Sequence, residues 1–176
     1  MCAAVTQPTF KEKALSESLI TAVAVGGFLI ILGVVFGLTP GVAQKTWDFL
    51  IDFTIQGFPF ASGTIILPAP AHPAAHMDFY NAVLTFNLGI GGLQLAILAA
   101  RIILHSSLRR IAETTGNIVF WFGAALATNA YLMLGTLDGW FTFWAAIIIV
   151  FGVSLIVRGL IQYLGWLRRK NSQNTQ

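Results

Sequence analysis

Charge is scarce in this chain, because only 10% of its 176 residues are charged whereas 56% are hydrophobic. Charged residues usually make up roughly a quarter of a soluble domain. A soluble protein of this length would have too small an interior to hide so much apolar surface from water. We therefore expect residues 1–176 to form a single membrane domain that has the lipid bilayer as its main surroundings.

The chain has a single cysteine and no acidic residue deep within an apolar stretch. The only cysteine, Cys2, excludes an intrachain disulfide and a cysteine-based metal cluster. No Asp or Glu lies deep in an apolar stretch, which argues against the proton-relay carboxylate of pumps and coupled transporters. The sequence has no Ser–His or Cys–His pair at a shared depth and no glycine-rich phosphate loop. We expect the protein not to be an enzyme.

Long apolar stretches are what the chain has in place of charge. Four of them are long enough to cross a hydrocarbon layer of ~30 Å, at residues 17–38, 79–104, 114–137 and 140–164. Because the bilayer core has no water to satisfy backbone amides, each span should be helical. The sequence therefore predicts an all-α integral membrane protein with four transmembrane helices in an antiparallel bundle.

The basic residues predict the orientation of these spans. Nine of the ten Lys and Arg residues share one side of a four-span layout, and Lys45 alone lies on the other side. Lys and Arg accumulate in cytoplasmic loops, so we expect a multi-pass protein of the cell membrane with N- and C-termini cytoplasmic. Since these charges sit at helix ends as anchors, the net charge of +3 does not indicate a nucleic-acid partner.

The segment 39–78, on the predicted outer side, divides into two parts. Polar residues recur in its first part at three- and four-residue spacing, with apolar residues on the other side, which is typical of an amphipathic helix in the membrane interface. These polar residues are Lys45, Asp48, Asp52 and Gln56. The second part contains Pro59, Pro68, Pro70 and Pro73, and we expect a Pro-rich extended loop there.

Two histidines and a carboxylate come together where this loop enters the second span. His72, His76 and Asp78 have the side chains that bind Zn²⁺ or Cu²⁺, and Asp48, Asp52 or Asp138 would add a ligand. The simpler interpretation is that they are polar residues at a helix entrance, where Asp78 favours the positive end of the helix dipole. We expect no cofactor, and a zinc or copper site at the outer face is the alternative.

Polar side chains interrupt the apolar surface of the later spans. Polar groups that face lipid are costly, so we expect these residues to face other helices. They are Asn81, Asn87, Gln94, Asn117, Thr128, Asn129 and Arg158. Interhelical hydrogen bonding is one interpretation, a solute path between helices 2, 3 and 4 is another, and a contact face for a partner subunit is the third. Arg158 should lie near the inner boundary, with Glu17 and Glu113 as candidate partners.

The first span carries a motif for close helix packing. Gly33 and Gly37 form a GxxxG pattern, which lets a second helix approach within the protomer or from another protomer. Together with the polar spans, it leads us to expect a non-catalytic accessory or structural subunit of a larger membrane complex, or a small homo-oligomer. The alternatives are a small-solute or ion channel or carrier, and an outer-side metal-binding accessory protein.

Overall fold

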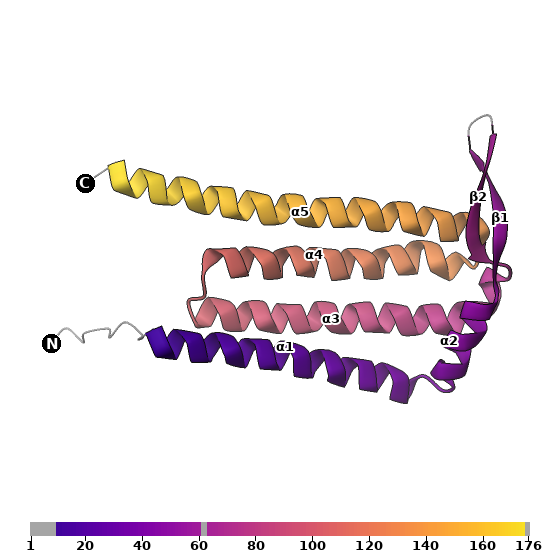
Figure 1. The fold of residues 1–176 in the computed structure, drawn as a ribbon, viewed down its shortest axis with the longest axis horizontal. Helices are drawn as coiled ribbons and strands as arrows, with labels where there is room; N and C mark the ends of the chain where they lie inside the picture. The colour runs from indigo at the N-terminus through magenta and orange to yellow at the C-terminus, as the bar shows by residue number, and fades with distance from the viewer. Residues whose placement is uncertain (1–9, 61–62, 175–176) are drawn as a thin grey trace.

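The computed structural model describes residues 10–60 and 63–174, and helices dominate it. The elements follow in the order α1 (Phe10–Leu38), α2 (Val42–Ile51), β1 (Phe53–Phe60), β2 (Gly63–Pro70), the 3₁₀ turn η1 (Pro73–His76), α3 (Met77–Ile103), α4 (Leu108–Tyr131), the 3₁₀ turn η2 (Leu132–Leu134) and α5 (Leu137–Asn174). Figure 1 shows how they are arranged.

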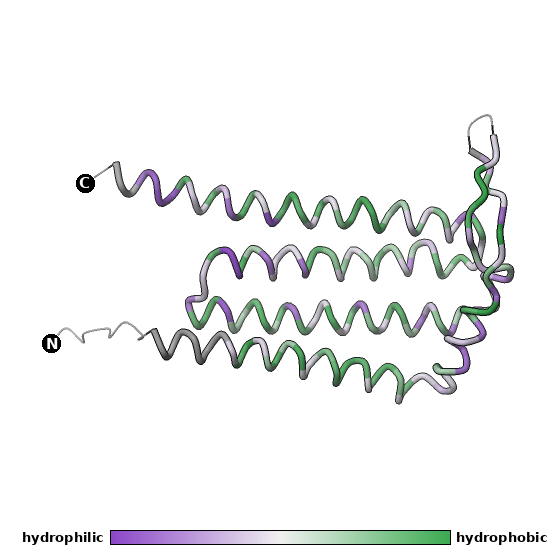
Figure 2. The backbone as a smooth tube through the Cα atoms, in the orientation of Figure 1, coloured by the Kyte–Doolittle hydropathy of each residue, from purple (hydrophilic) through white to green (hydrophobic). Residues whose placement is uncertain are grey.

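Four helical stretches have the length and hydropathy of membrane spans, which confirms that part of the prediction. They are Ser18–Leu38, Pro73–Ile103, Leu108–Leu134 and Leu137–Asn171. The helices α4 and α5 extend past the third and fourth predicted spans at the end that carries their Arg residues. Figure 2 shows hydrophobic residues along most of these helices, with hydrophilic ones toward the left-hand ends of α4 and α5 and at intervals along α3.

The four long helices lie side by side in chain order. Figure 1, which looks down the shortest axis, shows a row of α1, α3, α4 and α5 in which the chain reverses direction from one helix to the next. The main helix contacts follow the same order, α1 with α3, α3 with α4, and α4 with α5. A closed bundle would also bring α1 against α5, whereas here these two helices form opposite edges of the row.

The proline-rich part of segment 39–78 is an antiparallel hairpin, so the expected Pro-rich extended loop and the all-α class need correction. β1 pairs with β2 from Phe53 opposite Pro70 to Phe60 opposite Gly63. Proline has no N–H to donate, but a two-stranded hairpin consists only of edge strands, where a missing donor is tolerated. The end of the row that carries α2 and this hairpin is called the hairpin end below. The opposite end, with the α3–α4 connection and the last turns of α5, is called the arginine end.

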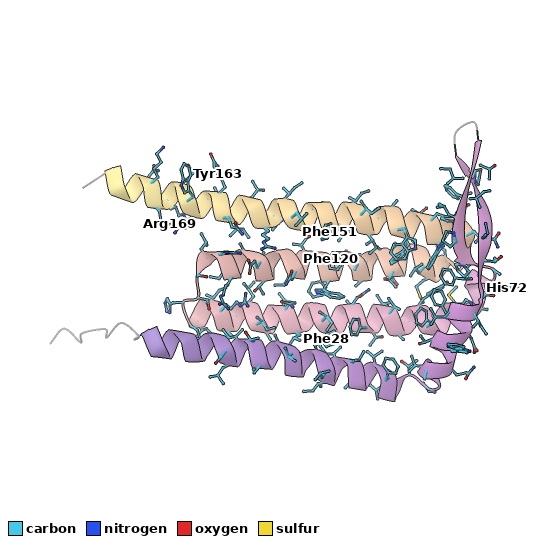
Figure 3. The ribbon with its side chains drawn as sticks, in the orientation of Figure 1. Phe28, His72, Phe120, Phe151, Tyr163 and Arg169 are labelled. Atoms are coloured by element: carbon cyan, nitrogen blue, oxygen red, sulfur yellow. The ribbon has the colours of Figure 1, made fainter. Side chains whose placement is uncertain are left out.

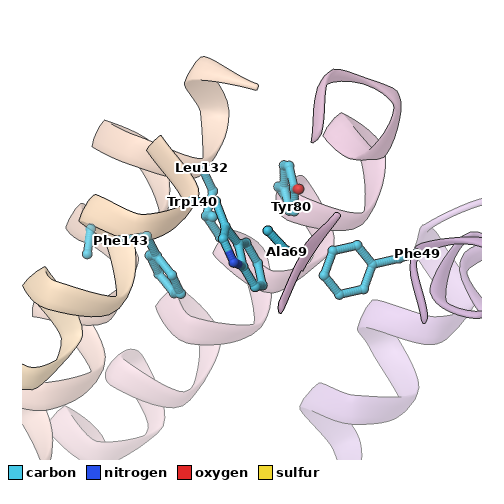
Figure 4. Close-up of a cluster of buried hydrophobic side chains, with 7 residues drawn as sticks. Phe49, Ala69, Tyr80, Leu132, Trp140 and Phe143 are labelled. Atoms are coloured by element: carbon cyan, nitrogen blue, oxygen red, sulfur yellow. The ribbon is translucent and has the colours of Figure 1, made fainter. Parts of the chain in front are cut away.

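The largest buried cluster lies at the hairpin end. Side chains from α2, β2, α3, α4, η2 and α5 converge there, as Figure 4 shows. The cluster comprises Phe49, Ala69, Tyr80, Ala127, Leu132, Trp140 and Phe143. Phe49 is central to it, since its ring stacks on Phe79 at 4.4 Å between centroids and meets Tyr80 and Trp140 at 5.9 Å. This packing fixes α2 against α3 and α5, and it positions the polar residues described next.

Candidate functional site

Three residues at the hairpin end form a hydrogen-bonded group that we call the His–Asp cluster: Asp52, His72 and His76. Asp52 Oδ1 lies 2.9 Å from His72 Nδ1, and Asp52 Oδ2 lies 2.8 Å from His76 Nε2. The backbone N–H of His72 also donates to Oδ2, at 2.8 Å. An ionised carboxylate only accepts hydrogen bonds, so each imidazole nitrogen that faces it carries a proton.

The hairpin register brings these residues together. Phe53 pairs with Pro70, and the ladder continues one step further, because the Ala71 N–H donates to the Asp52 carbonyl at 2.9 Å. The residue before β1 therefore lies beside the residues that follow β2. The two imidazoles differ in exposure, since the His72 side chain is 77% exposed and that of His76 only 8%. Figure 3 shows His72 at this end of the molecule.

The pKa of Asp52 is about 2, below its ordinary value of 3.8. Burial raises this pKa, but hydrogen bonds from the two imidazoles and from the His72 backbone N–H outweigh it, and the charge of His72 adds to their effect. Asp52 is therefore ionised over the whole physiological pH range. It acts as a charged acceptor that ties the start of the hairpin to the start of α3.

The predicted group of His72, His76 and Asp78 is only partly assembled. The two histidines meet Asp52, whereas Asp78 Oδ2 pairs with Lys45 Nζ at 2.6 Å. Among residues 10–60 and 63–174, no group of three or more His, Cys, Asp or Glu side chains is arranged to hold a metal ion. The imidazole nitrogens that face Asp52 are occupied by hydrogen bonds to its carboxylate, so a metal would bind only through the other ring nitrogen of each histidine.

One hydrogen bond joins polar residues of neighbouring spans in the middle of the row. Asn87 Nδ2 donates to Thr128 Oγ1 at 3.3 Å, and both side chains are buried between α3 and α4. The Thr128 hydroxyl in turn donates to the Ala124 carbonyl. This pair belongs to the residues expected to join helices or line a path, and its visible role is to join two helices.

The other predicted path residues are spread over the surface of the row. Asn81, Asn117 and Asn129 are exposed, and Gln94 is half-buried. Asn117 borders a small cavity of about 150 Å³ between α4 and α5, together with Glu113. Exposed amides on different helices do not enclose a path within one protomer. A path that includes them needs a second wall from another chain.

Charged residues join the helices at the arginine end. Arg158 Nη2 on α5 lies 2.8 Å from Glu113 Oε1 on α4, and Arg109 Nε lies 3.1 Å from the same oxygen. Arg101 on α3 donates through Nη1 to Thr114 Oγ1 and to the Arg110 carbonyl, each at 2.6 Å. Glu113 is thus the carboxylate beside Arg158, while the side chain of the other candidate, Glu17, falls outside the part of the chain whose side chains are described.

The GxxxG motif of α1 lies away from α3. A Cβ added at Gly33 or Gly37 would meet no other described atom within 4 Å. By contrast, a Cβ at Gly27 would collide with the Leu93 side chain, and one at Gly89 with Ile31. Within the described chain, α1 and α3 therefore pack through Gly27 and Gly89, and the predicted motif is exposed at the edge of the row.

No family model, curated protein or solved structure matches this chain. What the polar groups can do follows from their own geometry. The carboxylates of Asp52, Asp78 and Glu113 each face a histidine, lysine or arginine nitrogen within 3.1 Å. In the described residues most of these pairs join one element to the next, and Arg109–Glu113 lies within α4.

Proposed function

We propose that the protein is a non-catalytic subunit of a membrane assembly, either an accessory or structural subunit of a larger complex or a copy in a small homo-oligomer. The observation that carries this proposal is the outward surface of α3. The outward surface of α5 shows what that surface would look like if lipid alone covered it.

The exposed stripe of α3 is rich in small and polar residues. Its members recur at three- and four-residue steps along one side of the helix, and we call them the α3 stripe: Asn81, Thr85, Leu88, Gly92, Leu95, Ala96 and Ala99. A Cβ added at Gly92 would meet nothing within 4 Å in the described chain. Small residues let helix backbones approach one another closely, and polar residues hydrogen-bond across such contacts.

The outward surface of α5 differs from the α3 stripe in composition. It consists mainly of large apolar side chains, namely Ile148, Ile149, Phe151, Val153, Leu155, Ile156 and Leu160. Such side chains suit the hydrocarbon of a bilayer, which offers no reason to prefer Gly, Ala or Asn. The contrast between two helices of the same row supports a protein partner over the α3 stripe.

The edge helix α1 offers a second surface of the same type. Gly33 and Gly37 are exposed on the side away from α3, with open space beside both. A helix from another chain would fit against them at close range. Helices of other chains therefore have space to pack at two places, against the exposed glycines of α1 and against the α3 stripe.

The same proposal includes location and orientation. We propose that the protein resides in the cell membrane with both termini on the cytoplasmic side. The support is the asymmetry of basic residues, because Arg101, Arg109, Arg110, Arg158, Arg168, Arg169 and Lys170 belong to the arginine end whereas Lys45 belongs to the hairpin end. This asymmetry matches the excess of Lys and Arg on cytoplasmic loops.

Native mass spectrometry of the tagged protein, extracted gently from its own membrane, tests the subunit proposal. We expect masses that contain other polypeptides or several copies of the 19.0 kDa chain. In the Gly92→Leu variant these masses should give way to the lone protomer, since the new side chain has space in the protomer but obstructs an approaching helix.

Gly159→Leu on α5 is the matched control. It introduces the same side chain at another exposed glycine with open space beside its Cβ, on the surface made of large apolar residues. The control should keep the assembly intact. A lone protomer in the wild type, or equal loss of the assembly in both variants, would contradict the proposal.

A further inference from the structure

A groove opens at the arginine end between the start of α4 and the last turns of α5. Its volume is about 490 Å³. Four of the lining residues are apolar or glycine and two are arginines: Leu108, Ile161, Leu164, Gly165, Arg168 and Arg169. The groove therefore combines an apolar wall with two guanidinium groups within one or two helical turns.

The different lengths of α4 and α5 create this groove. Gly165 packs directly against the Leu108 side chain, so the first residue of α4 is level with Gly165 of α5. From there α5 continues to Asn174, and Arg168 and Arg169 lie about one turn beyond the start of α4. Figure 3 shows Arg169 on this projecting part of α5, with Tyr163 close to where that part begins.

The depth of the groove matches the headgroup region of a bilayer. At 1.5 Å per residue, Arg168 lies about 42 Å along α5 from Trp140, close to the 40–45 Å thickness of a bilayer with its headgroups. Tyr163 and Trp166 stack at 6.1 Å on the exposed surface of the same turns, and Lys170 Nζ lies 5.3 Å from the Trp166 ring centroid. Aromatic and basic residues of this kind accumulate at the membrane interface.

We propose that this groove binds an anionic phospholipid. The acyl chain lies along Leu108, Ile161 and Leu164, and the phosphate meets the guanidinium groups of Arg168 and Arg169. Arg169 donates through Nε to the Gly165 carbonyl at 3.4 Å, which leaves the two terminal nitrogens of its fork to face phosphate oxygens. Basic pockets between transmembrane helices bind lipid headgroups by the same combination of charge and apolar contact.

The inference is independent of the subunit proposal, because it concerns a groove within one protomer. The test uses the full-length protein, delipidated in a non-ionic detergent, with native mass spectrometry at increasing concentrations of added lipid. Phosphatidylglycerol and phosphatidylcholine with identical acyl chains are compared. We expect the wild type to retain phosphatidylglycerol in preference to phosphatidylcholine. In the double variant Arg168→Gln/Arg169→Gln this preference should fall by about 30-fold.

Two further variants separate the groove from the general positive charge of this end. Arg109→Gln/Lys170→Gln removes the same net charge outside the groove lining and should keep the preference. Leu164→Gln should weaken the binding of both lipids while the preference between them persists, because it alters only the apolar wall. Excess inorganic phosphate should not displace the bound lipid.

Three results would overturn the proposal. One is equal retention of the two lipids by the wild type. Another is a loss of preference in Arg109→Gln/Lys170→Gln as large as that in Arg168→Gln/Arg169→Gln, which would indicate diffuse attraction to the whole arginine end. Displacement of the lipid by inorganic phosphate would indicate an anion site without a chain-binding wall.

Discussion

Replacing Asp52 with alanine should loosen the connection between the hairpin and α3. The substitution leaves the buried His76 Nε2–H and the His72 backbone N–H without an acceptor. Each unsatisfied buried donor costs about 1–3 kcal/mol. The His72 ring adds little, since its side chain is 77% exposed and regains water. The exposed His72 backbone N–H also regains water, so the buried His76 donor sets the loss, which we expect to be about 2 kcal/mol and to weaken protection against hydrogen exchange by about 30-fold.

The assay is hydrogen–deuterium exchange of the detergent-solubilised protein, read at the amides of Ala71 and His72. The Ala71 N–H donates to the Asp52 carbonyl and the His72 N–H to the Asp52 carboxylate, so both report on opening at this place. Asp48→Ala is the control, because the Asp48 carboxylate accepts from the exposed Gln44 side chain one helical turn away. Such exposed pairs contribute about 0.5 kcal/mol or less, so the control should change protection by about twofold.

The effect of Asp52→Ala should also depend on pH. A carboxyl whose folded-state pKa is lowered stabilises the fold above its unfolded pKa and loses this contribution as the pH falls through the folded value. For Asp52 these values are 3.8 and about 2. The difference in protection between wild type and variant should shrink below about pH 5 and close as the pH falls through about 2. Protection at Ala71 within about threefold of wild type, at neutral pH, would refute the reasoning.

Two further predictions concern contacts between the spans. Asn87→Leu should destabilise the fold by about 0.6 kcal/mol through loss of its hydrogen bond to Thr128, measured by SDS-induced unfolding. A double-mutant cycle with Thr128→Val that shows no coupling would contradict this. Gly116→Val should lower stability by about 1–3 kcal/mol, because a Cβ there lies 3.1 Å from the Ser154 carbonyl oxygen. Gly159→Val, where the Cβ meets open space, should be milder in the same assay, and equal losses would argue against close α4–α5 packing.

The four spans could be predicted from the sequence because the signal is local. A run of apolar residues long enough to cross a bilayer needs no knowledge of its neighbours. The ends were harder to predict. The helix α4 begins at Leu108, ahead of the apolar stretch 114–137, and Arg109 and Glu113 pair along one side of its first turns. The row of helices depends on contacts between spans, which a hydropathy pattern does not contain.

The hairpin was missed because its prolines indicate a loop when each is considered alone. Strand pairing joins residues up to 17 positions apart, such as Phe53 and Pro70, and that relation has no local signal. The same omission left the His–Asp cluster only partly predicted, because Asp52 is one of three carboxylates expected near the histidines and the hairpin decides among them. Once Phe53 lies opposite Pro70, Asp52 necessarily lies beside Ala71 and His72. Without the hairpin, Asp78 was the natural carboxylate to group with the histidines, because it follows His76 by two residues.

The polar residues of the spans were recognised by type, but their partners depend on helix rotation. Asn87 was singled out together with Thr128, and these two form a hydrogen bond. Asn117 and Asn129 belong to the same helix as Thr128 and yet are exposed. The direction in which a side chain of a transmembrane helix points depends on how that helix is rotated about its own axis. The neighbouring helices determine this rotation. A single sequence shows the spacing of the polar residues along the helix, but it does not determine which neighbour they face.

The row has a consequence for biosynthesis. Its main helix contacts join each span to the span that precedes it, so a newly inserted helix finds its partner already in the membrane. Contacts between chain neighbours close short loops and form quickly, and domains fold in the order in which they emerge from the ribosome. The Arg158–Glu113 pair and the Gly165–Leu108 contact form last, when α5 joins α4. The protomer is thus extended at one edge only, and its α1 edge is available to a neighbouring chain before translation ends.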